Sequence, residues 1–489
     1  MIKKIKAVAL SILVFSLCFA AFPLVGCNSQ LDAKSKYAIT ATYYENEKRI
    51  DATMIVEYVN SAAIELDSVM FHLYPRAFRE GARFPAVSPS QLYDAYPLGM
   101  SYGDISILKV VRDGEEQDIT IVGEDEDILR VDGAIKPHAS ATIEIDFLLR
   151  LPTVRHRFGL FDGIVNLGNW YPIACIVREG KYDATPYYSN GDPFNSDIAD
   201  YDVSISVPEK FKVATSGRQT ESKSNGTKTV RAKIENARDL AAVIGQFNVI
   251  SKTHNGVLLN YYYRSDMDPP YQLGTAADAL DTYSEMFGAY IYDSLSVVKT
   301  PFLHGGMEYP ALIYISDELN QSLFTEVIAH ETAHQWWYAA VGSDQIREAW
   351  LDEGLTEYTT TLFYEFNPSY GVTRNERLAD AMSAYILFCE RYKNNGKDDT
   401  SMNRSVAQFS TALEYSFLTY VKGELMIDTL RESIGDKAFF EGLKIYYREN
   451  KLGRAACDDF IGAFEAASRT NLKGFFNSWL TGKVKMFAA

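Results

Sequence analysis

The chain has 489 residues, which is enough for two or three domains with sizeable cores. Hydrophobic residues make up 47% and charged residues 23%, so the composition argues against a largely disordered chain. The formal net charge of -16 disfavours nucleic acid or an anionic lipid surface as a partner of the folded body.

The beginning of the sequence has the pattern of a bacterial export signal. Three lysines within the first six residues precede an uncharged, mostly apolar run from Ala7 to Gly26. The run ends in Leu-Val-Gly before Cys27, which resembles the lipobox of bacterial lipoproteins. We therefore expect a signal peptide over 1–26, a tether over 27–36, and a lipid on Cys27 that holds the protein on the outer face of a bacterial cell membrane. An uncleaved anchor of about 20 apolar residues is the alternative.

Three further cysteines, Cys175, Cys389 and Cys457, are scattered over the rest of the sequence. Their odd number and the lack of a C-x-x-C pair argue against a disulfide framework. We expect buried thiols at these positions.

The stretch from 37 to 266 has the period of β-strands. Apolar and polar residues alternate over 143–147 and again over 203–207, which predicts strands with one buried face. Asn225-Gly226 and Asn255-Gly256 lie between short alternating runs and predict hairpin turns. We therefore expect an N-terminal antiparallel β-sheet domain over 37–266.

The apolar period lengthens after a polar stretch that ends in Pro269-Pro270, so we place a second, mostly helical domain over 267–489 and assign the protein to the α+β class. Helices are expected over 271–290, 422–434 and 437–447, with short strands at 295–298 and 312–315. A further helix is expected to start at a cap formed by Ser316 or Asp317 and to run to Gly342.

The second domain contains a motif that fits a catalytic zinc ion. His330 and His334 are four residues apart, so on a helix both imidazoles lie on one face. Glu353 follows after eighteen intervening residues and can supply a carboxylate. Two nitrogens, one carboxylate and an open fourth position are typical of a catalytic zinc site. Glu331 is then placed to act as the base that takes a proton from the attacking water.

Metal-ligating histidines usually need an acceptor on their second ring nitrogen. Glu326, four residues before His330, and Glu357, four after Glu353, are candidates for this contact. Both are equally compatible with ordinary charges on a helix surface.

Two further motifs flank the zinc motif. Gly305-Gly306-Met307-Glu308-Tyr309 precedes it, and Tyr420-Val-Lys-Gly follows it. With the zinc motif, they resemble the gluzincin aminopeptidases of the aminopeptidase N family (membrane alanyl aminopeptidase), whose patterns are G-x-M-E-N and Y-x-K-G. The resemblance is specific over about 295–430. It implies a thermolysin-like catalytic domain that holds one zinc ion per chain.

The resemblance also implies roles for single residues. Glu308 would bind the free α-amine of a peptide substrate, and the main chain at Gly305 and Gly306 would align the substrate backbone. Tyr420 would donate a hydrogen bond to the oxyanion of the tetrahedral intermediate. The expected activity is the zinc-dependent removal of N-terminal residues from peptides. A zinc endopeptidase and a catalytically weak, tethered peptide-binding protein are the alternatives.

The sequence also departs from the family pattern. Tyr309 and Asp352 stand where the family usually has asparagine, and His304 occupies a position that shapes the pocket for the first side chain. The β domain shows no clear second amine-binding residue, for which we consider the region 170–172. The sequence continues for about 136 residues after Glu353, which is too short for the superhelical C-terminal domain of many relatives, so we expect a more open cleft.

Overall fold

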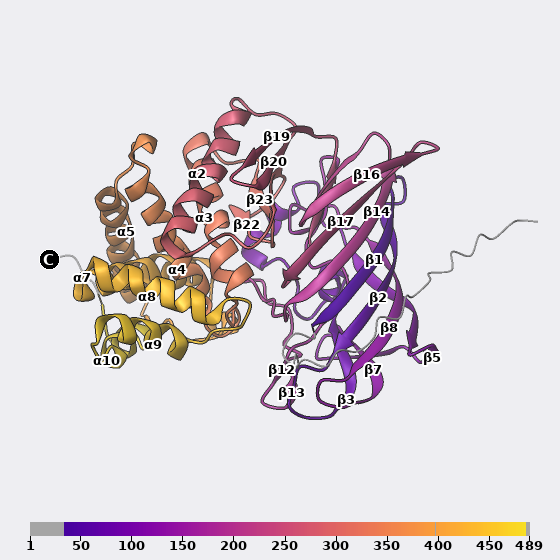
Figure 1. Ribbon diagram of the computed structural model, residues 1–489, viewed down its shortest axis with the longest axis horizontal. Helices are drawn as coiled ribbons and strands as arrows, with labels where there is room; N and C mark the ends of the chain where they lie inside the picture. The colour runs from indigo at the N-terminus through magenta and orange to yellow at the C-terminus, as the bar shows by residue number, and fades with distance from the viewer. Residues whose placement is uncertain (1–33, 397, 486–489) are drawn as a thin grey trace, which may run out of the picture. The chain divides into compact units, whose positions relative to one another are not determined.

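Strands dominate the first half of the chain and helices the second half (Figure 1). The computed structural model describes residues 34–396 and 398–485. This order of a β part followed by a mostly helical part confirms the predicted α+β class. The predicted signal peptide and Cys27 lie outside the described residues. A bilayer-spanning helix needs a long apolar run, and no helix of the described part has one.

An eight-stranded sheet forms the framework of the first half. Its neighbours are antiparallel except for the parallel pair of the first and fourteenth strands. Apolar side chains alternate into the core, as the sequence pattern predicts. In spatial order the strands are β16 (Arg218–Ser224), β17 (Thr227–Ala237), β14 (Ala199–Pro208), β1 (Ser35–Tyr44), β2 (Arg49–Val59), β8 (Ser140–Arg150), β4 (Asp104–Arg112) and β5 (Glu115–Gln117).

Smaller sheets complete this half, with a short helix α1 (Leu92–Ala95) in one connection. One sheet contains β11 (Ile173–Ala174), β3 (Leu66–His72), β7 (Ile128–Ile135) and β6 (Thr120–Val122). Another contains β15 (Lys212–Thr215), β18 (Ala242–Gly245), β10 (Ile164–Leu167) and β9 (Phe158–Phe161). A two-stranded ribbon pairs β12 (Val177–Arg178) with β13 (Lys181–Tyr182).

A five-stranded sheet joins the two halves of the chain. Its order is β19 (Asn248–His254), β20 (Val257–Tyr263), β21 (Ser294–Thr300), β23 (Leu312–Ser316) and β22 (Gly306–Met307). The hairpins predicted at Asn225-Gly226 and Asn255-Gly256 both form, and all four turn residues have positive φ. The predicted domain boundary falls just after β20, and β20 pairs with β21 from beyond it.

Nine α-helices, two π-type turns and two short 3-10 helices, counted over the described residues, follow from position 269 onward, on the side of the five-stranded sheet away from the large β-sheet (Figure 1). They are α2 (Pro269–Phe287), α3 (Gln321–Ala333), α4 (Ala349–Phe366), α5 (Arg374–Asn394), α6 (Ala412–Ser416), α7 (Lys422–Ile434), α8 (Asp436–Asn450), α9 (Cys457–Ser468) and α10 (Lys473–Leu480). The predicted helices over 271–290, 422–434 and 437–447 correspond to α2, α7 and α8.

The helix predicted from Ser316 or Asp317 to Gly342 is wrong at both ends. The cap is Asn320, whose side chain accepts from the Leu323 amide, while Ser316 belongs to β23. The α-helix ends at Ala333, and residues 335–340 form a wider π-type turn in which two residues leave helical geometry. This turn buries two tryptophans, and their indole N–H groups donate to two different segments. Apolar periodicity does not reveal these hydrogen bonds, so it could not predict where the helix ends.

The helices α4 and α7 cross at a pair of glycines. A Cβ at Gly423 would lie 2.6 Å from the Cα of Gly354, so neither position accepts a larger side chain without a shift of the helices. The close approach brings the segment before α7, which contains Tyr420, next to the helix that contains Glu353.

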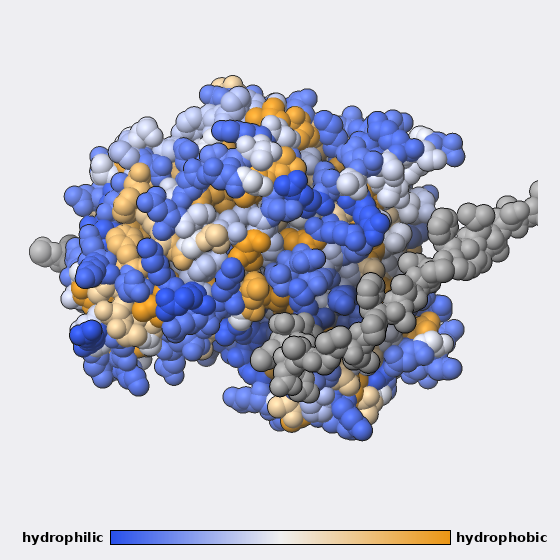
Figure 2. Space-filling view, in the orientation of Figure 1, coloured by the Kyte–Doolittle hydropathy of each residue, from blue (hydrophilic) through white to orange (hydrophobic). Residues whose placement is uncertain are grey.

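The described chain contains thiols and no disulfide at Cys175, Cys389 and Cys457, the first two of them buried. On the face shown in Figure 2, hydrophobic side chains occupy several separate areas of a mostly hydrophilic surface. Single exposed apolar residues of this kind are ordinary on a folded protein.

Candidate metal centre and its surroundings

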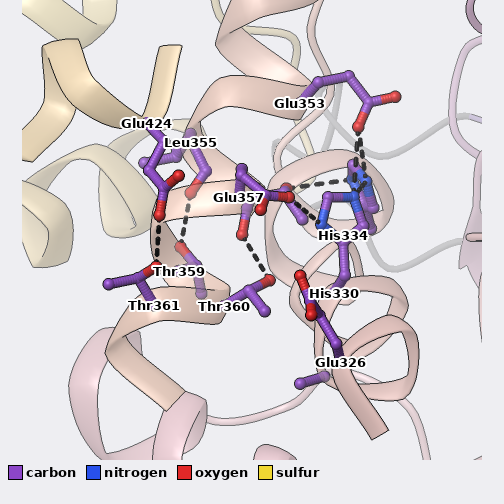
Figure 3. Close-up of polar contacts among 12 residues, drawn as sticks. Glu326, His330, His334, Glu353, Leu355, Glu357, Thr359, Thr360, Thr361 and Glu424 are labelled. Atoms are coloured by element: carbon purple, nitrogen blue, oxygen red, sulfur yellow. Dashed lines mark hydrogen bonds and ion pairs between the residues drawn. The ribbon is translucent and has the colours of Figure 1, made fainter. Parts of the chain in front are cut away.

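Helix α3, its C-cap His334 and helix α4 bring the three predicted metal ligands together. His334 Nε2 lies 3.2 Å from both His330 Nε2 and Glu353 Oε2, and His330 Nε2 lies 3.4 Å from the same carboxylate oxygen. All three side chains are almost fully buried. Two imidazole nitrogens and one carboxylate oxygen therefore converge on one point, as Figure 3 shows.

The second ring nitrogen of each histidine has its own partner. Nδ1 of His334 lies 3.0 Å from Asp352 and 3.1 Å from the carbonyl oxygen of Trp337. Nδ1 of His330 lies 3.1 Å from Glu357, one of the two acceptors considered from the sequence (Figure 3). These contacts orient the rings so that both Nε2 atoms face the shared point.

The other candidate acceptor has a different partner. Glu326 lies 3.0 Å from Arg377 of α5, and the same guanidinium donates to Glu357 at 2.9 Å. Arg377 therefore also binds Glu357, the carboxylate that contacts Nδ1 of His330. Asp352, noted in the sequence only as a departure from asparagine, is the partner of His334.

The electrostatics of the cluster favour a cation. Burial alone would lower the pKa of His330, but hydrogen bonds to Glu353 and Glu357 outweigh burial and raise it to about 10. Burial likewise opposes ionisation of Glu353, yet the charges of the two histidines hold the pKa of this carboxyl well below its usual range. The cluster thus attracts positive charge between its ligand atoms. The residues present fit a zinc ion by donor type, number and convergence.

Glu331 points into the cavity beside these ligands. Its Oε2 is buried and has no hydrogen-bond partner within the described residues. Burial raises the pKa of Glu331 to about 7. The carboxyl group packs against Gly306, where a Cβ would lie 2.3 Å from Oε1. A glycine at 306 is therefore needed for Glu331 to occupy this place.

The cavity has a volume of about 200 Å³ and contains the other predicted site residues. Gly305, Gly306, Glu308 and Tyr420 line it together with the metal-ligand cluster. The ring of Tyr420 stacks on His330 at 6.0 Å between centroids. A second cavity of about 450 Å³ shares the two glycines, Tyr420 and His304 with the first, so the two are adjacent.

Among the described residues, one residue of the β half lines the cavity that contains the metal-ligand cluster. The sequence did not indicate this residue. Asp192 lies in the connection between β13 and β14 and lines both cavities. Its carboxylate lies within 4.8 Å of ligand atoms of Glu308 and Glu353, and it accepts from Arg157 at 2.5 Å. Burial first, and then the charge of Asp192, raises the pKa of Glu308 well above its usual range.

Residues 170–172, considered above for a second amine-binding residue, line neither cavity. Trp170 and Tyr171 are completely buried in the core, where the Tyr171 hydroxyl donates to Asp239. Tyr309, the other departure from the family pattern, donates to Asn169 and so joins the glycine-rich strand to the β half. The only sequence signal for Asp192 is its turn-forming context, Asn-Gly-Asp-Pro, which is common in loops without function.

Comparison with known proteins agrees with this geometry. Residues 271–479 match the model of the peptidase family M1 domain. Aminopeptidase N of Lactobacillus delbrueckii subsp. lactis is 24% identical over 250 residues, which cover 48% of this chain and 29% of the relative. Glutamyl aminopeptidase of Homo sapiens is 24% identical over 308 residues, which cover 58% of this chain and 31% of the relative. The chain thus spans less than a third of the length of these curated relatives.

Solved structures match over nearly the whole chain. The M1 zinc metallopeptidase from Deinococcus radiodurans has a TM-score of 0.65 at 17% identity, over 93% of this chain and 94% of that one. A mutant of that metallopeptidase bound to a Tyr-Ser-Ala substrate has a TM-score of 0.62 at 15% identity, with the same coverage of 93% and 94%. The two-domain fold is therefore shared. Residues 271–479 thus match the peptidase family M1 domain, and this part of the chain is similar to aminopeptidases of the aminopeptidase N type.

Proposed function

We propose that this protein is a zinc-dependent aminopeptidase that removes N-terminal residues from peptides. The observation that carries the proposal is Glu308, a carboxylate buried in the same cavity as the metal-ligand cluster. A buried carboxylate beside another, Asp192, is costly unless a cation shares the space. The free ammonium group of a peptide is such a cation, and its position would set the distance to the scissile bond.

One zinc ion per chain, held by His330, His334 and Glu353, would supply Lewis acidity that activates water and polarises the scissile carbonyl. The side chain of Glu331 would accept a proton at its unpartnered Oε2 and return it to the leaving amine. Its pKa of about 7, raised by burial, suits both directions of transfer near neutral pH.

The remaining residues would orient the substrate and stabilise charge. Among the described residues, β22, with Gly306, is the edge strand of its sheet and pairs with β23, so a peptide backbone would add to its other side. Gly305 continues the same edge. The hydroxyl of Tyr420 would donate to the developing oxyanion. The names of the relatives, all aminopeptidases, support the same reaction class.

We further propose that the mature protein is a lipoprotein anchored through Cys27 on the outer face of a bacterial cell membrane. Support comes from the sequence alone: a lysine-rich start, an apolar run and a small residue directly before the cysteine.

Replacing Glu353 by Ala should remove most of the zinc, because two imidazoles without the carboxylate hold the ion far more weakly. The wild-type protein should contain about one zinc ion per chain by elemental analysis. The control is Glu365→Ala on the same helix, which breaks an ion pair with Arg431 and should keep the zinc. A full zinc equivalent in Glu353→Ala would contradict the ligand assignment.

Glu331→Gln should lower kcat by roughly 10²- to 10⁴-fold while zinc content stays the same, because the amide cannot accept the proton. The measurement is the release of reporter groups from a panel of aminoacyl substrates. A chelator should abolish the wild-type activity, and added zinc should restore it. Absence of zinc-dependent release across the whole panel would disprove the proposed reaction.

Glu308→Ala should lower kcat/KM for free-amine peptides by roughly ten- to a hundredfold, the range for losing a hydrogen bond to a charged group. Hydrolysis of the same peptides after N-acetylation, already slow, should not change. An equal loss on both series would remove the assigned role of Glu308 and favour an endopeptidase.

Cys27→Ser should abolish incorporation of a clickable fatty acid into the protein in growing bacterial cells. The matched control is Cys18→Ser, which changes the other leader cysteine and should leave labelling intact. Undiminished labelling of Cys27→Ser rules out this attachment site.

A further inference from the structure

The loop before α4 places one amide side chain between two parts of the site. Gln345 is 3% exposed. Its Nε2 donates to Glu308 Oε1 at 3.2 Å and to Asp352 Oδ2 at 2.6 Å. Glu308 lines the cavity where the substrate amine would bind, and Asp352 contacts the metal ligand His334 on its other oxygen. Gln345 thus connects the two carboxyl groups through a single nitrogen atom.

The orientation of this amide follows from chemistry. A glutamine nitrogen carries two hydrogen atoms, and a carboxylate oxygen can only accept. Both hydrogens of Gln345 are therefore committed, one to each carboxylate. The reverse orientation would set the amide carbonyl oxygen against two carboxylates in a buried place, which is strongly unfavourable.

We propose that Gln345 is a positioning residue that joins the amine-binding carboxylate of Glu308 to the carboxylate of Asp352, which fixes His334. The inference rests on the proposed function for the role of Glu308, but its link to the metal ligand does not. Through Gln345, the place of the substrate amine and the orientation of one metal ligand depend on the same side chain.

The backbone on both sides of Gln345 is held in place. Asp344 accepts from the amides of Ile346 and Arg347, which fixes the turn. The side chain of Asp344 also meets Arg178 of β12 at 2.6 Å. Arg347 contacts Asp183, just after β13, through two nitrogens at 2.7 and 3.0 Å.

These ion pairs connect the β half to the loop, because Arg178 and Asp183 come from it and Asp344 and Arg347 from the catalytic half. They are partly buried, and hydrogen bonds from Arg347 outweigh burial and hold the pKa of Asp183 at about 2. The β half thereby fixes the backbone that presents Gln345 to the two carboxylates.

Loss of the two donors has a definite consequence. The oxygens of Glu308 and Asp352 that share Nε2 lie within about 6 Å of each other, since both are at hydrogen-bond distance from one atom. Without a donor between them, the two buried carboxyl groups lose their shared hydrogen-bond partner, and each turns toward other partners. Glu308 then leaves the amine position, and His334 loses part of what fixes its ring.

The test compares Gln345→Leu, which removes both donors at similar volume, and Gln345→Glu, which has the same shape but offers acceptors. Both should weaken zinc binding by roughly ten- to a hundredfold, the range for losing an outer-shell contact, and Gln345→Glu more strongly. Zinc affinity is measured by competition with a chelator. At saturating zinc, kcat for aminoacyl substrates should recover, while KM stays about tenfold or more above wild type.

The matched control is Gln272→Leu. Gln272 of α2 is 1% exposed and donates to Gln321 at 2.9 Å, away from both cavities. It should keep wild-type zinc affinity and KM, which separates positioning from the general effect of changing a buried glutamine. If Gln345→Leu does not fold, the isosteric Gln345→Glu carries the comparison.

Wild-type zinc affinity and KM in a folded Gln345 variant would overturn the proposal. A loss of zinc affinity with unchanged KM at saturating zinc would overturn the link to Glu308. If the wild-type protein itself releases nothing from aminoacyl substrates, the proposed function fails, and zinc affinity alone then decides whether Gln345 acts on Asp352 and His334.

Discussion

The arrangement of the site depends on the electrostatic cost of burying carboxylates together. Asp192, Glu308, Glu331, Asp352 and Glu353 are all nearly inaccessible to solvent and lie around two imidazoles. Ionised carboxylates so close to one another in a buried place are unfavourable unless cations share them. The chain supplies Arg157 and the two histidines, and the remaining deficit of positive charge is what a zinc ion and a substrate ammonium group would fill. The proposed binding of a metal ion and of a substrate amine would therefore both offset the cost of burying these carboxylates.

The β half contributes charged side chains to the site and to the loop beside it. Arg157 and Asp192 come from it, and the ion pairs of Arg178 and Asp183 hold the loop with Gln345. The shared sheet, in which β20 pairs with β21, fixes the two halves to each other at another place. A cut between the halves near residue 266 would separate strands of one sheet and remove an acidic residue from the cavity.

The sequence predicted the metal-ligand cluster because its chemistry is local. Two histidines four residues apart need only helical geometry to share one face, and the spacing of Glu353 indicated a carboxylate that the packing of α4 on α3 then brings to them. The Asn-Gly hairpins and the strand and helix periods were predictable for the same reason, since each depends on a few adjacent residues. The family resemblance added Glu308 and Tyr420, which the structure places in the same cavity, although their roles stay predictions.

Features that depend on contacts between distant segments could not be read from the sequence. Asp192 and Gln345 are ordinary loop residues until the tertiary fold brings them to Glu308. Ser316 and Asp317 are cap-forming residue types just before Asn320, and the tertiary structure excludes them because Ser316 belongs to β23 and α3 begins only at Gln321. The π-type turn after His334 depends on where two indole rings find acceptors, which periodicity does not encode.

The glycine pair at the crossing of α4 and α7 has a consequence for the Y-x-K-G motif. Helix α7 begins two residues after Tyr420, so the close approach of α4 and α7 at the glycine pair influences where the phenol lies relative to Glu353 of α4. Because Gly423 has no side chain, α7 can lie close to α4, and the segment with Tyr420 lies correspondingly close to the metal-ligand cluster. The Y-x-K-G motif therefore combines two requirements: a tyrosine hydroxyl for the site, and a glycine that allows two helix backbones to approach closely.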